Sequence, residues 1–236
     1  PTTMLIANFQ TGSSTHLITL AVIGILTAAL AVAVGRTAGE PTRVLLRNLI
    51  GWGSLIAGLL NTAYWMFPSR FDLSQSLPLH LCNLANFIGA LAVLRESRLF
   101  RGLLYFWSGL CLWAFLTPTL DTGVGEPGFW IFWLYHSFIL FTLVLVVRGD
   151  RFRPSLRDLR RSIAFSLGLV VCLFGINATT GWNYGFLGDD VPGVPTPVSL
   201  LGAYPLRILW MILLGAGIFV LLWLPWRNYS TTRTRK

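Results

Sequence analysis

Apolar residues dominate seven long stretches of the chain, which polar or charged segments separate. The stretches lie at about 16–35, 45–66, 77–94, 102–120, 128–148, 162–179 and 205–225. A transmembrane helix needs about 20 mostly apolar residues to cross about 30 Å of hydrocarbon. Each stretch should be helical, because lipid offers no hydrogen-bond partner to an open backbone. The pattern predicts an all-α membrane protein, a seven-transmembrane-helix bundle that forms a single polytopic domain over residues 1–236.

Basic residues mark every second loop between these stretches. Of the 18 Lys and Arg residues, three, three, six and four fall within 36–47, 95–101, 148–161 and 227–236, in that order. Loops rich in Arg and Lys stay cytoplasmic, so the N-terminus should lie outside and the C-terminus in the cytoplasm. We therefore expect a multi-pass protein of the inner cell membrane.

Composition limits the kinds of partner that the chain is expected to bind. Charged residues make up only 11% of it and hydrophobic residues 54%, whereas a soluble domain carries about 25% charged residues. The net charge of +9 comes from arginines between apolar runs, which is unlike a basic face for nucleic acid. Membrane lipids are the expected partners, with no nucleic acid.

The third stretch holds the densest group of polar residues. At about 100° per residue, His80, Cys82, Asn83 and Asn86 fall within an arc of about 160° of one helix. Such an arc should face the bundle interior, because polar groups are costly in lipid. His136 of the fifth stretch lies at a similar depth, about 12 Å below its outer end at 1.5 Å per residue. These residues predict a polar cavity at or just below the outer face.

Two interpretations of this polar group stay open. In the first, Cys82 is a nucleophile and His136 its base, because an imidazole can hold a thiol as the reactive thiolate. His80 is a second candidate base, although on an ideal helix it points away from Cys82. In the second, these side chains only hydrogen-bond helices together. Asp121 either orients an imidazole or caps a short loop.

Further polar and aromatic residues lie at the outer ends of other stretches. The segment 180–204 is the longest outside loop, and its aromatic first part either folds over the cavity as a lid or anchors at the membrane interface. Residues expected to line a substrate site are His80, Asn83, Asn86, Asp121, Asn177, Asn183 and Tyr184. Cys111 and Cys172, among apolar neighbours, read as small hydrophobes. Three histidines on three stretches make no metal set, and no cofactor is expected.

Several of these segments together resemble the YwaF-like family of bacterial integral membrane proteins. The resemblance rests on segments in the family's order: Leu77–Asn83, Leu116-Thr117-Pro118, Tyr135-His136-Ser137, Asn177 with Gly181–Leu187, and Pro205–Trp210. Trp182 stands where the family usually has Thr. The family mostly lacks an assigned activity, but a distantly related vertebrate branch is regarded as intramembrane phospholipid acyltransferases that use a cysteine and a histidine. The resemblance thus implies that Cys82 carries the acyl group and His136 is the base.

The leading hypothesis is an intramembrane lipid acyl-transfer or hydrolysis enzyme, in which Asn83 or Asn86 polarises the attacked carbonyl. A second hypothesis is a non-catalytic accessory or scaffold subunit of a larger membrane complex, with partner membrane proteins. In that case the polar side chains would serve as packing groups or as ligands of a bound lipid or pigment. A third is a transporter or receptor that uses the outer cavity. The absence of Gly-Pro breaks within the stretches counts against a transporter.

Overall fold

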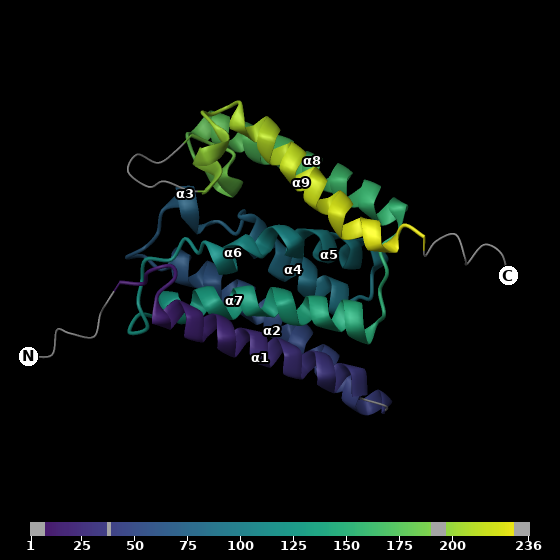
Figure 1. The fold of residues 1–236 in the computed structure, drawn as a ribbon. Coiled ribbons are helices and arrows are strands. Elements are labelled where there is room, and N and C mark those ends of the chain that lie inside the picture. Colours follow the sequence, from purple (N-terminus) through teal and green to yellow (C-terminus); the bar gives the residue numbers. More distant parts are fainter. Residues whose placement is uncertain (1–7, 37–38, 190–196, 229–236) are drawn as a thin grey trace, which may run out of the picture.

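The computed structural model describes residues 8–36, 39–189 and 197–228, and these residues form a bundle of helices running between two ends (Figure 1). The long helices are α1 (Ser14–Arg36), α2 (Glu40–Met66), α5 (Arg98–Cys111), α7 (Pro127–Val144), α8 (Leu156–Thr180) and α9 (Arg207–Trp223). Shorter elements are α3 (Leu73–Ser76), α4 (Leu81–Leu94), α6 (Trp113–Leu116), η1 (Leu145–Gly149), η2 (Tyr184–Phe186), η3 (Pro197–Leu201) and η4 (Leu224–Trp226). The described residues include no strand.

Six helices in the described residues are long and apolar enough to cross a membrane. They are α1, α2, α5 continued by α6, α7 continued by η1, α8, and α9 continued by η4. The stretch expected at 77–94 differs, because α4 begins only at Leu81 and has 14 residues. Pro78 lacks a backbone N–H and restricts the residue before it, which favours a later helix start. The expectation that His80 lies on a helical face was therefore wrong, since His80 is the residue that precedes α4.

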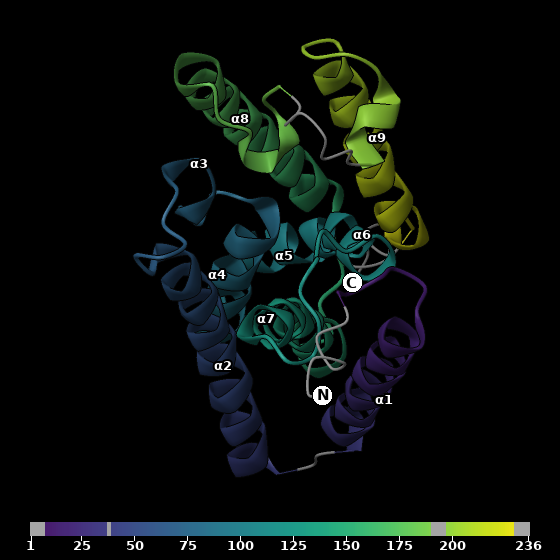
Figure 2. The same cartoon turned by 90° about the vertical axis from the view of Figure 1, so that its left-hand side faces the viewer.

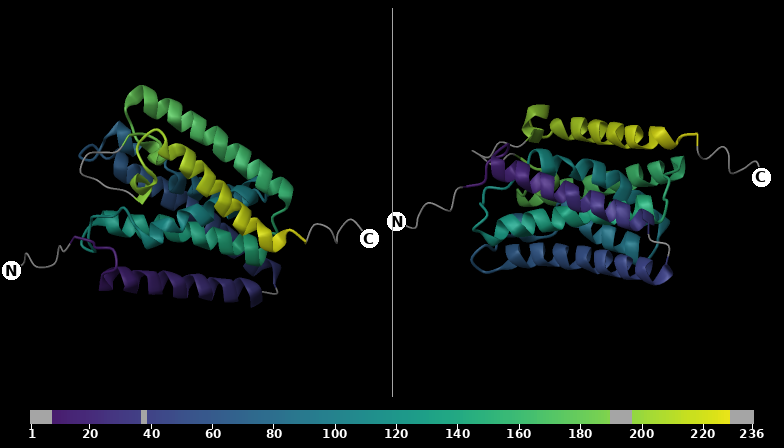
Figure 3. Two further views of the ribbon diagram at one scale, coloured as in Figure 1. Left: turned by 45° about the horizontal axis from the view of Figure 1, so that its top comes forward. Right: turned by 60° about the horizontal axis from the view of Figure 1, so that its bottom comes forward.

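The helices form a packed centre with outer helices on two sides. Helices α2, α5 and α7 each contact α4, and α7 also contacts α2 and α5. Helix α7 lies near the middle of the bundle in the end view of Figure 2. On one side α1 packs against α7 and η1. On the other, α8 and α9 lie side by side against α5 (Figure 3). The core cluster includes Ala85, Leu104, Phe106 and Ile139, each fully buried.

One end of the bundle is held by ion pairs. We call it the ionic end, and its charged residues are Arg47, Glu96, Arg98, Arg101, Asp150 and Asp158. Asp150 pairs with Arg47 at 2.6 Å and with Arg101 at 2.8 Å. Asp158 is buried, and its carboxylate accepts from Arg98 at 2.6 Å. Asp158 also completes a capping box with Ser155, which fixes where α8 begins.

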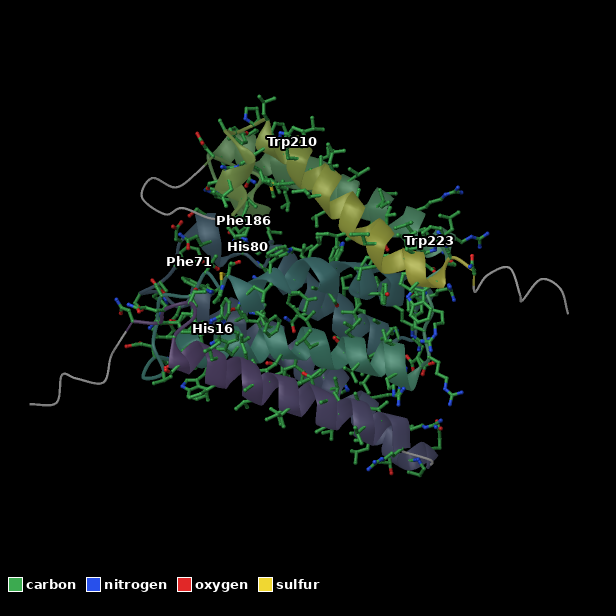
Figure 4. The ribbon with its side chains drawn as sticks, viewed as in Figure 1. His16, Phe71, His80, Phe186, Trp210 and Trp223 are labelled. Atoms are coloured by element: carbon green, nitrogen blue, oxygen red, sulfur yellow. The ribbon has the colours of Figure 1, made fainter. Side chains whose placement is uncertain are left out.

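The opposite end carries short connections and aromatic rings. Asp72 caps α3 by accepting from the Ser74 N–H at 2.8 Å, and hydrogen bonds from Ser74 lower the pKa of the Asp72 carboxyl. Figure 4 shows His16, Phe71, His80 and Phe186 at this end, with Trp223 at the other. The polar residues of α4 and α7 lie toward this end, which we call the polar end.

Candidate functional site

Helix α4 turns its polar side chains toward α2, α5 and α7. Asn83 accepts a 3.1 Å hydrogen bond from the Asn61 amide of α2. Asn86 is completely buried and reaches both α2 and α7. Cys82 is half-buried and packs against the core cluster that includes Cys111 of α5 and Ile139 of α7. The structure therefore brings these three side chains to one side of the helix, inside the bundle.

The two asparagines of α4 differ in whether their side-chain amide nitrogens have hydrogen-bond partners. The Asn86 amide nitrogen donates to the Tyr135 carbonyl at 2.8 Å and to the Cys82 carbonyl at 3.3 Å. Its side-chain oxygen accepts from the Ser54 hydroxyl at 3.1 Å. Asn83 uses its oxygen to accept from Asn61, and no hydrogen bond of the described residues is donated by its amide nitrogen. Asn86 is thus a saturated link between helices, whereas Asn83 retains a donor beside Cys82.

Helix packing brings Cys82 near two other reactive side chains. The Asn86 amide donates to the carbonyls of both Cys82 and Tyr135, the residue before His136 on α7. Cys82 also packs against the buried cluster that contains Cys111 of α5. His136 and Cys111 are each 2% exposed. This packing brings Cys82 near His136, two residues that the sequence placed at similar depth on separate helices.

Backbone hydrogen bonding sets which nitrogen of His136 is basic. The Nδ1 atom lies 2.8 Å from the Phe132 carbonyl, one turn earlier on α7. A carbonyl oxygen only accepts, so Nδ1 carries the proton and Nε2 keeps its lone pair. The ring is held between Tyr135 and Phe132, whose centroids lie 4.0 and 4.2 Å away. His136 therefore presents an oriented imidazole whose Nε2 is the nitrogen that remains for a further partner.

His16 is a second buried histidine with a different environment. Its Nδ1 atom accepts from the Gly12 N–H at 2.9 Å, and Nε2 lies 2.8 Å from the Phe115 carbonyl. Both ring nitrogens have hydrogen-bond partners, so His16 links α1 to α6 and has no lone pair left to act as a base.

Asp121 is exposed in a loop. A carboxylate that orients His136 would lie beside its Nδ1 atom, but the Phe132 carbonyl occupies that position.

The segment 181–188 folds inward over the polar end. His80 packs against the rings of Tyr184 and Phe186 with centroid separations of 5.2 and 5.9 Å. Its Nδ1 atom accepts from the Gly185 N–H at 3.4 Å. This segment therefore covers His80, two residues before Cys82. Residues 190–196 of the same loop lie outside the described residues.

Asparagine and tyrosine side chains hold this cover in place. Asn177 of α8 donates to the Tyr184 carbonyl at 2.9 Å and accepts from the Tyr184 N–H at 3.0 Å. The Tyr184 hydroxyl donates to the Leu73 carbonyl and accepts from the Leu77 N–H. Burial raises the pKa of the Tyr184 phenol, so it stays protonated as a donor. Asn183 accepts from the Gly188 N–H at 2.9 Å. These three residues shape the loop and are not aimed at Cys82.

Sequence reasoning missed Cys111 as a neighbour of the site. A single cysteine between leucines is interpreted as a small apolar residue, and this interpretation did not show that Cys82 packs against the cluster to which Cys111 belongs. Helix α5 ends at Cys111, and after Leu112 the Phe115 N–H bonds back to Leu112 over only three residues. Cys111 lies at the middle of the predicted stretch 102–120, so depth alone did not single it out. Cys172 is exposed on α8, away from this cluster.

Two cavities lie elsewhere in the bundle. One, of about 370 Å³, is at the polar end and is lined by Asn8, Phe9, Gln10, Ser13, Thr15 and Gly123. The other, of about 350 Å³, is apolar and lies between α5–α6 and α9. Neither lining includes Cys82 or His136. Among residues 8–36, 39–189 and 197–228, no three His, Cys, Asp or Glu side chains gather to hold a metal ion.

Comparison with known proteins places this arrangement in a membrane protein family. The model of the TMEM164 family matches residues 11–223. The chain belongs to the TMEM164 family. The match covers every helix that carries the Cys82 cluster and the segment that covers it. No curated protein and no solved structure matches the chain. With six apolar helices of spanning length in the described residues, this member of the TMEM164 family is a multi-pass membrane protein.

Proposed function

We propose that the chain is an intramembrane enzyme that transfers or hydrolyses lipid acyl groups, with Cys82 as nucleophile and His136 as general base. The observation that carries the proposal is the Asn86 amide, which donates to the Cys82 carbonyl of α4 and to the Tyr135 carbonyl of α7 and so holds the Cys82 and His136 positions close together. Because Phe132 holds the proton of His136 on Nδ1, the free Nε2 lone pair is available to the thiol. A nucleophile beside an oriented base is the usual arrangement for covalent catalysis.

The chemistry follows from these two groups. His136 Nε2 takes the Cys82 proton, and the thiolate attacks the carbonyl carbon of a lipid ester. As the ester C–O bond breaks, His136 returns the proton to the leaving alkoxide, which departs as a lysolipid. A thioester on Cys82 remains. His136 then takes a proton from an incoming lipid hydroxyl or from water, whose oxygen attacks the thioester carbonyl carbon. The new C–O bond forms and the C–S bond breaks, so the acyl group leaves as a lipid ester or a fatty acid, and His136 returns the proton to the Cys82 sulfur.

Asn83 supports this chemistry as a donor to the carbonyl oxygen. Negative charge develops on that oxygen during attack, and a fixed amide N–H stabilises it. Asn83 follows Cys82 on α4, and no hydrogen bond of the described residues is donated by its amide nitrogen. Asn86 is a poor candidate for this role, because both carbonyls that it binds would have to be released.

The location of the cluster favours a lipid substrate. We propose seven passes, with α3–α4 as the third, because α4 runs between α2, α5 and α7 in the bundle. In Figure 1, α1 begins at the polar end and α9 finishes at the ionic end. The ionic end carries Arg47, Arg98 and Arg101, so by the positive-inside rule it is cytoplasmic and the N-terminus lies outside. Cys82 then lies in the outer half of the inner cell membrane, within reach of membrane lipids.

Acyl transfer is tested with the purified protein in phosphatidylcholine nanodiscs. Intact-mass spectrometry should detect a hydroxylamine-sensitive acyl adduct on Cys82, and labelled acyl chains should appear on added lysophosphatidylcholine. Cys82→Ala should abolish both signals, and His136→Ala should slow transfer by about 10²- to 10⁴-fold. Cys172→Ala is the matched control, because that thiol is exposed on α8, and it should behave as the parent.

Three results would contradict the proposal. They are an adduct that maps to Cys172, full activity in Cys82→Ala, and no transfer by the parent from phosphatidylcholine, phosphatidylethanolamine or phosphatidylglycerol.

Helix α1 favours a second candidate function, that of an accessory subunit, because most of its surface is exposed in the bundle. Co-purification of partner membrane proteins on α1, together with no transfer by the parent, would favour that role.

A further inference from the structure

Arg70 is a basic residue of the polar end that forms no ion pair with a described residue. All the ion pairs in the part of the chain that the structure describes lie at the ionic end. Arg70 is exposed between α2 and α3, beside Phe71, which Figure 4 labels at the polar end. Asp72, the nearest acidic residue along the chain, accepts from the Ser74 N–H. The charge of the Arg70 guanidinium is therefore available to an anion.

The ring of Tyr64 holds this guanidinium by stacking. The Arg70 Cζ atom lies 4.5 Å from the centroid of the Tyr64 ring, near the end of α2. A stacked arginine presents its flat face to the ring, and its N–H donors stay at the edge, where they match the oxygens of a phosphate. No hydrogen bond between described residues involves the Tyr64 hydroxyl. The pair thus offers a charge and a hydroxyl side by side.

A second hydroxyl lies close to the first. A Cβ atom added to Gly128, in the first turn of α7, would lie 2.8 Å from the Tyr64 hydroxyl oxygen and 3.1 Å from Thr122 Oγ1. Both oxygens therefore lie beside the start of α7. Thr122 Oγ1 is buried, and among the described residues it has no hydrogen-bond partner. A buried hydroxyl without a partner is costly, so its position beside Tyr64 points to a ligand that accepts from it.

This group lies nearer the polar end than Cys82 does. The Asn61 amide of α2 donates to Asn83, the residue after Cys82. Tyr64 follows Asn61 by three residues, so it lies on the same side of α2 and about 4.5 Å closer to the polar end. In a glycerophospholipid the phosphate lies on the water side of the acyl esters, to which glycerol joins it. A lipid with its ester at Cys82 thus has its phosphate at the level of Tyr64 and Arg70.

We propose that Arg70 and Tyr64 bind the phosphate of a membrane phospholipid, with Thr122 as a third donor. The inference rests on the proposed function, for which it supplies the headgroup site of the lipid whose ester Cys82 attacks. Arg70 contributes its charge and the N–H donors of the guanidinium edge, and the two hydroxyls donate to the remaining phosphate oxygens. A phosphate held there keeps the ester at one depth relative to Cys82.

The test is lipid binding by the full chain in detergent micelles, measured by native mass spectrometry as dioleoylphosphatidylcholine or dioleoylglycerol is added. The two lipids carry the same acyl chains, and only the first has a phosphate. Arg70→Gln should weaken phosphatidylcholine binding about tenfold, the effect of one lost charge-assisted hydrogen bond, and leave dioleoylglycerol binding unchanged. Tyr64→Phe keeps the ring under Arg70 and should weaken phosphatidylcholine binding severalfold. Arg157→Gln is the matched control, because Arg157 is an exposed arginine at the start of α8, and it should bind both lipids as the parent does.

Three binding results would overturn the inference. If Arg70→Gln weakens the binding of both lipids equally, or of neither, Arg70 does not bind the phosphate. If Arg157→Gln weakens phosphatidylcholine binding as much as Arg70→Gln does, only the net charge of the chain matters. If inorganic phosphate alone displaces phosphatidylcholine from the parent, the site belongs to free phosphate and not to a lipid headgroup.

Acyl transfer separates a failure of this inference from a failure of the proposed function. If both hold, the loss in Arg70→Gln should appear mainly as a higher KM for phosphatidylcholine, because the phosphate is bound before and during the reaction. Transfer with an unchanged KM in Arg70→Gln would keep the enzyme function and remove the phosphate site. Binding that depends on Arg70, in a protein that transfers no acyl group, would keep the phosphate site and remove the enzyme function.

Discussion

The ionic end and the polar end of the bundle both contain buried polar groups, but they use them in opposite ways. At the ionic end, Asp158 accepts from Arg98 and Ser155, and Asp150 pairs with Arg47 and Arg101. Its carboxylates are matched by nearby donors. At the polar end, uncharged groups predominate, and His136 Nε2 and the Asn83 amide keep capacity to bind something else. Saturated groups stabilise a fold, whereas groups left open within a fixed frame are suited to act on a ligand.

The substitution with the largest expected effect is at the ionic end. Asp158→Ala removes the capping box of α8 and leaves the Ser155 hydroxyl and N–H without their acceptor. We expect it to lower the free energy of unfolding by about 3 kcal/mol, from the lost cap and the buried charge-assisted hydrogen bonds. Denaturant titration in mild detergent would measure this loss. Acyl transfer per folded molecule should stay near the parent value, and a loss of transfer in the folded fraction would contradict the division between the two ends.

At the polar end we expect a smaller effect, and we expect it on acyl transfer instead of on stability. Asn83→Ala should slow acyl transfer by about a hundredfold, because it removes the donor to the developing oxyanion. Asn61→Ala is the control, since it breaks the same Asn61–Asn83 hydrogen bond while keeping the Asn83 amide. Single-turnover acylation of Cys82, followed by mass spectrometry, compares the two. Equal slowing in both variants would mean that Asn83 acts through helix packing alone.

Much of the fold could be predicted from hydrophobic runs, because burial in lipid requires long apolar helices. Six of the seven predicted stretches correspond to helices of spanning length in the described residues. The third did not, because Asp72 caps the separate helix α3 and Pro78 delays the start of α4 to Leu81. Hydropathy is averaged over many residues and does not register a single cap or proline. It therefore located the apolar stretch correctly but placed His80 within a helix, whereas α4 begins after His80.

The sequence predicted how deep each site residue lies along its helix, but not which residues of neighbouring helices lie next to each other. Residue counting placed Cys82 and His136 at similar levels, and only the packing of α4 against α7, with the Asn86 amide between them, brings the two positions near each other. The tautomer of His136 depends on a hydrogen bond to its own helix, which no spacing rule reveals. Cys111 looked inert because its apolar neighbours in sequence hide a neighbour in space. Asn177 and Tyr184 were expected near a substrate, whereas their bonds hold the covering loop.

The covering loop gives the smallest predicted effect. Tyr184→Phe removes the hydrogen bonds to Leu73 and Leu77 that tie residues 181–188 to the segment before α4. It should cost about 1 kcal/mol of stability and, by loosening the cover beside His80, speed alkylation of Cys82 severalfold at alkaline pH. Tyr105→Phe is the counterpart at the ionic end, where the hydroxyl donates to the Leu222 carbonyl and accepts from Trp226. It should cost a similar amount and leave Cys82 alkylation unchanged. If both variants expose Cys82 equally, the loop is no cover, and general loosening of the bundle controls access to the thiol.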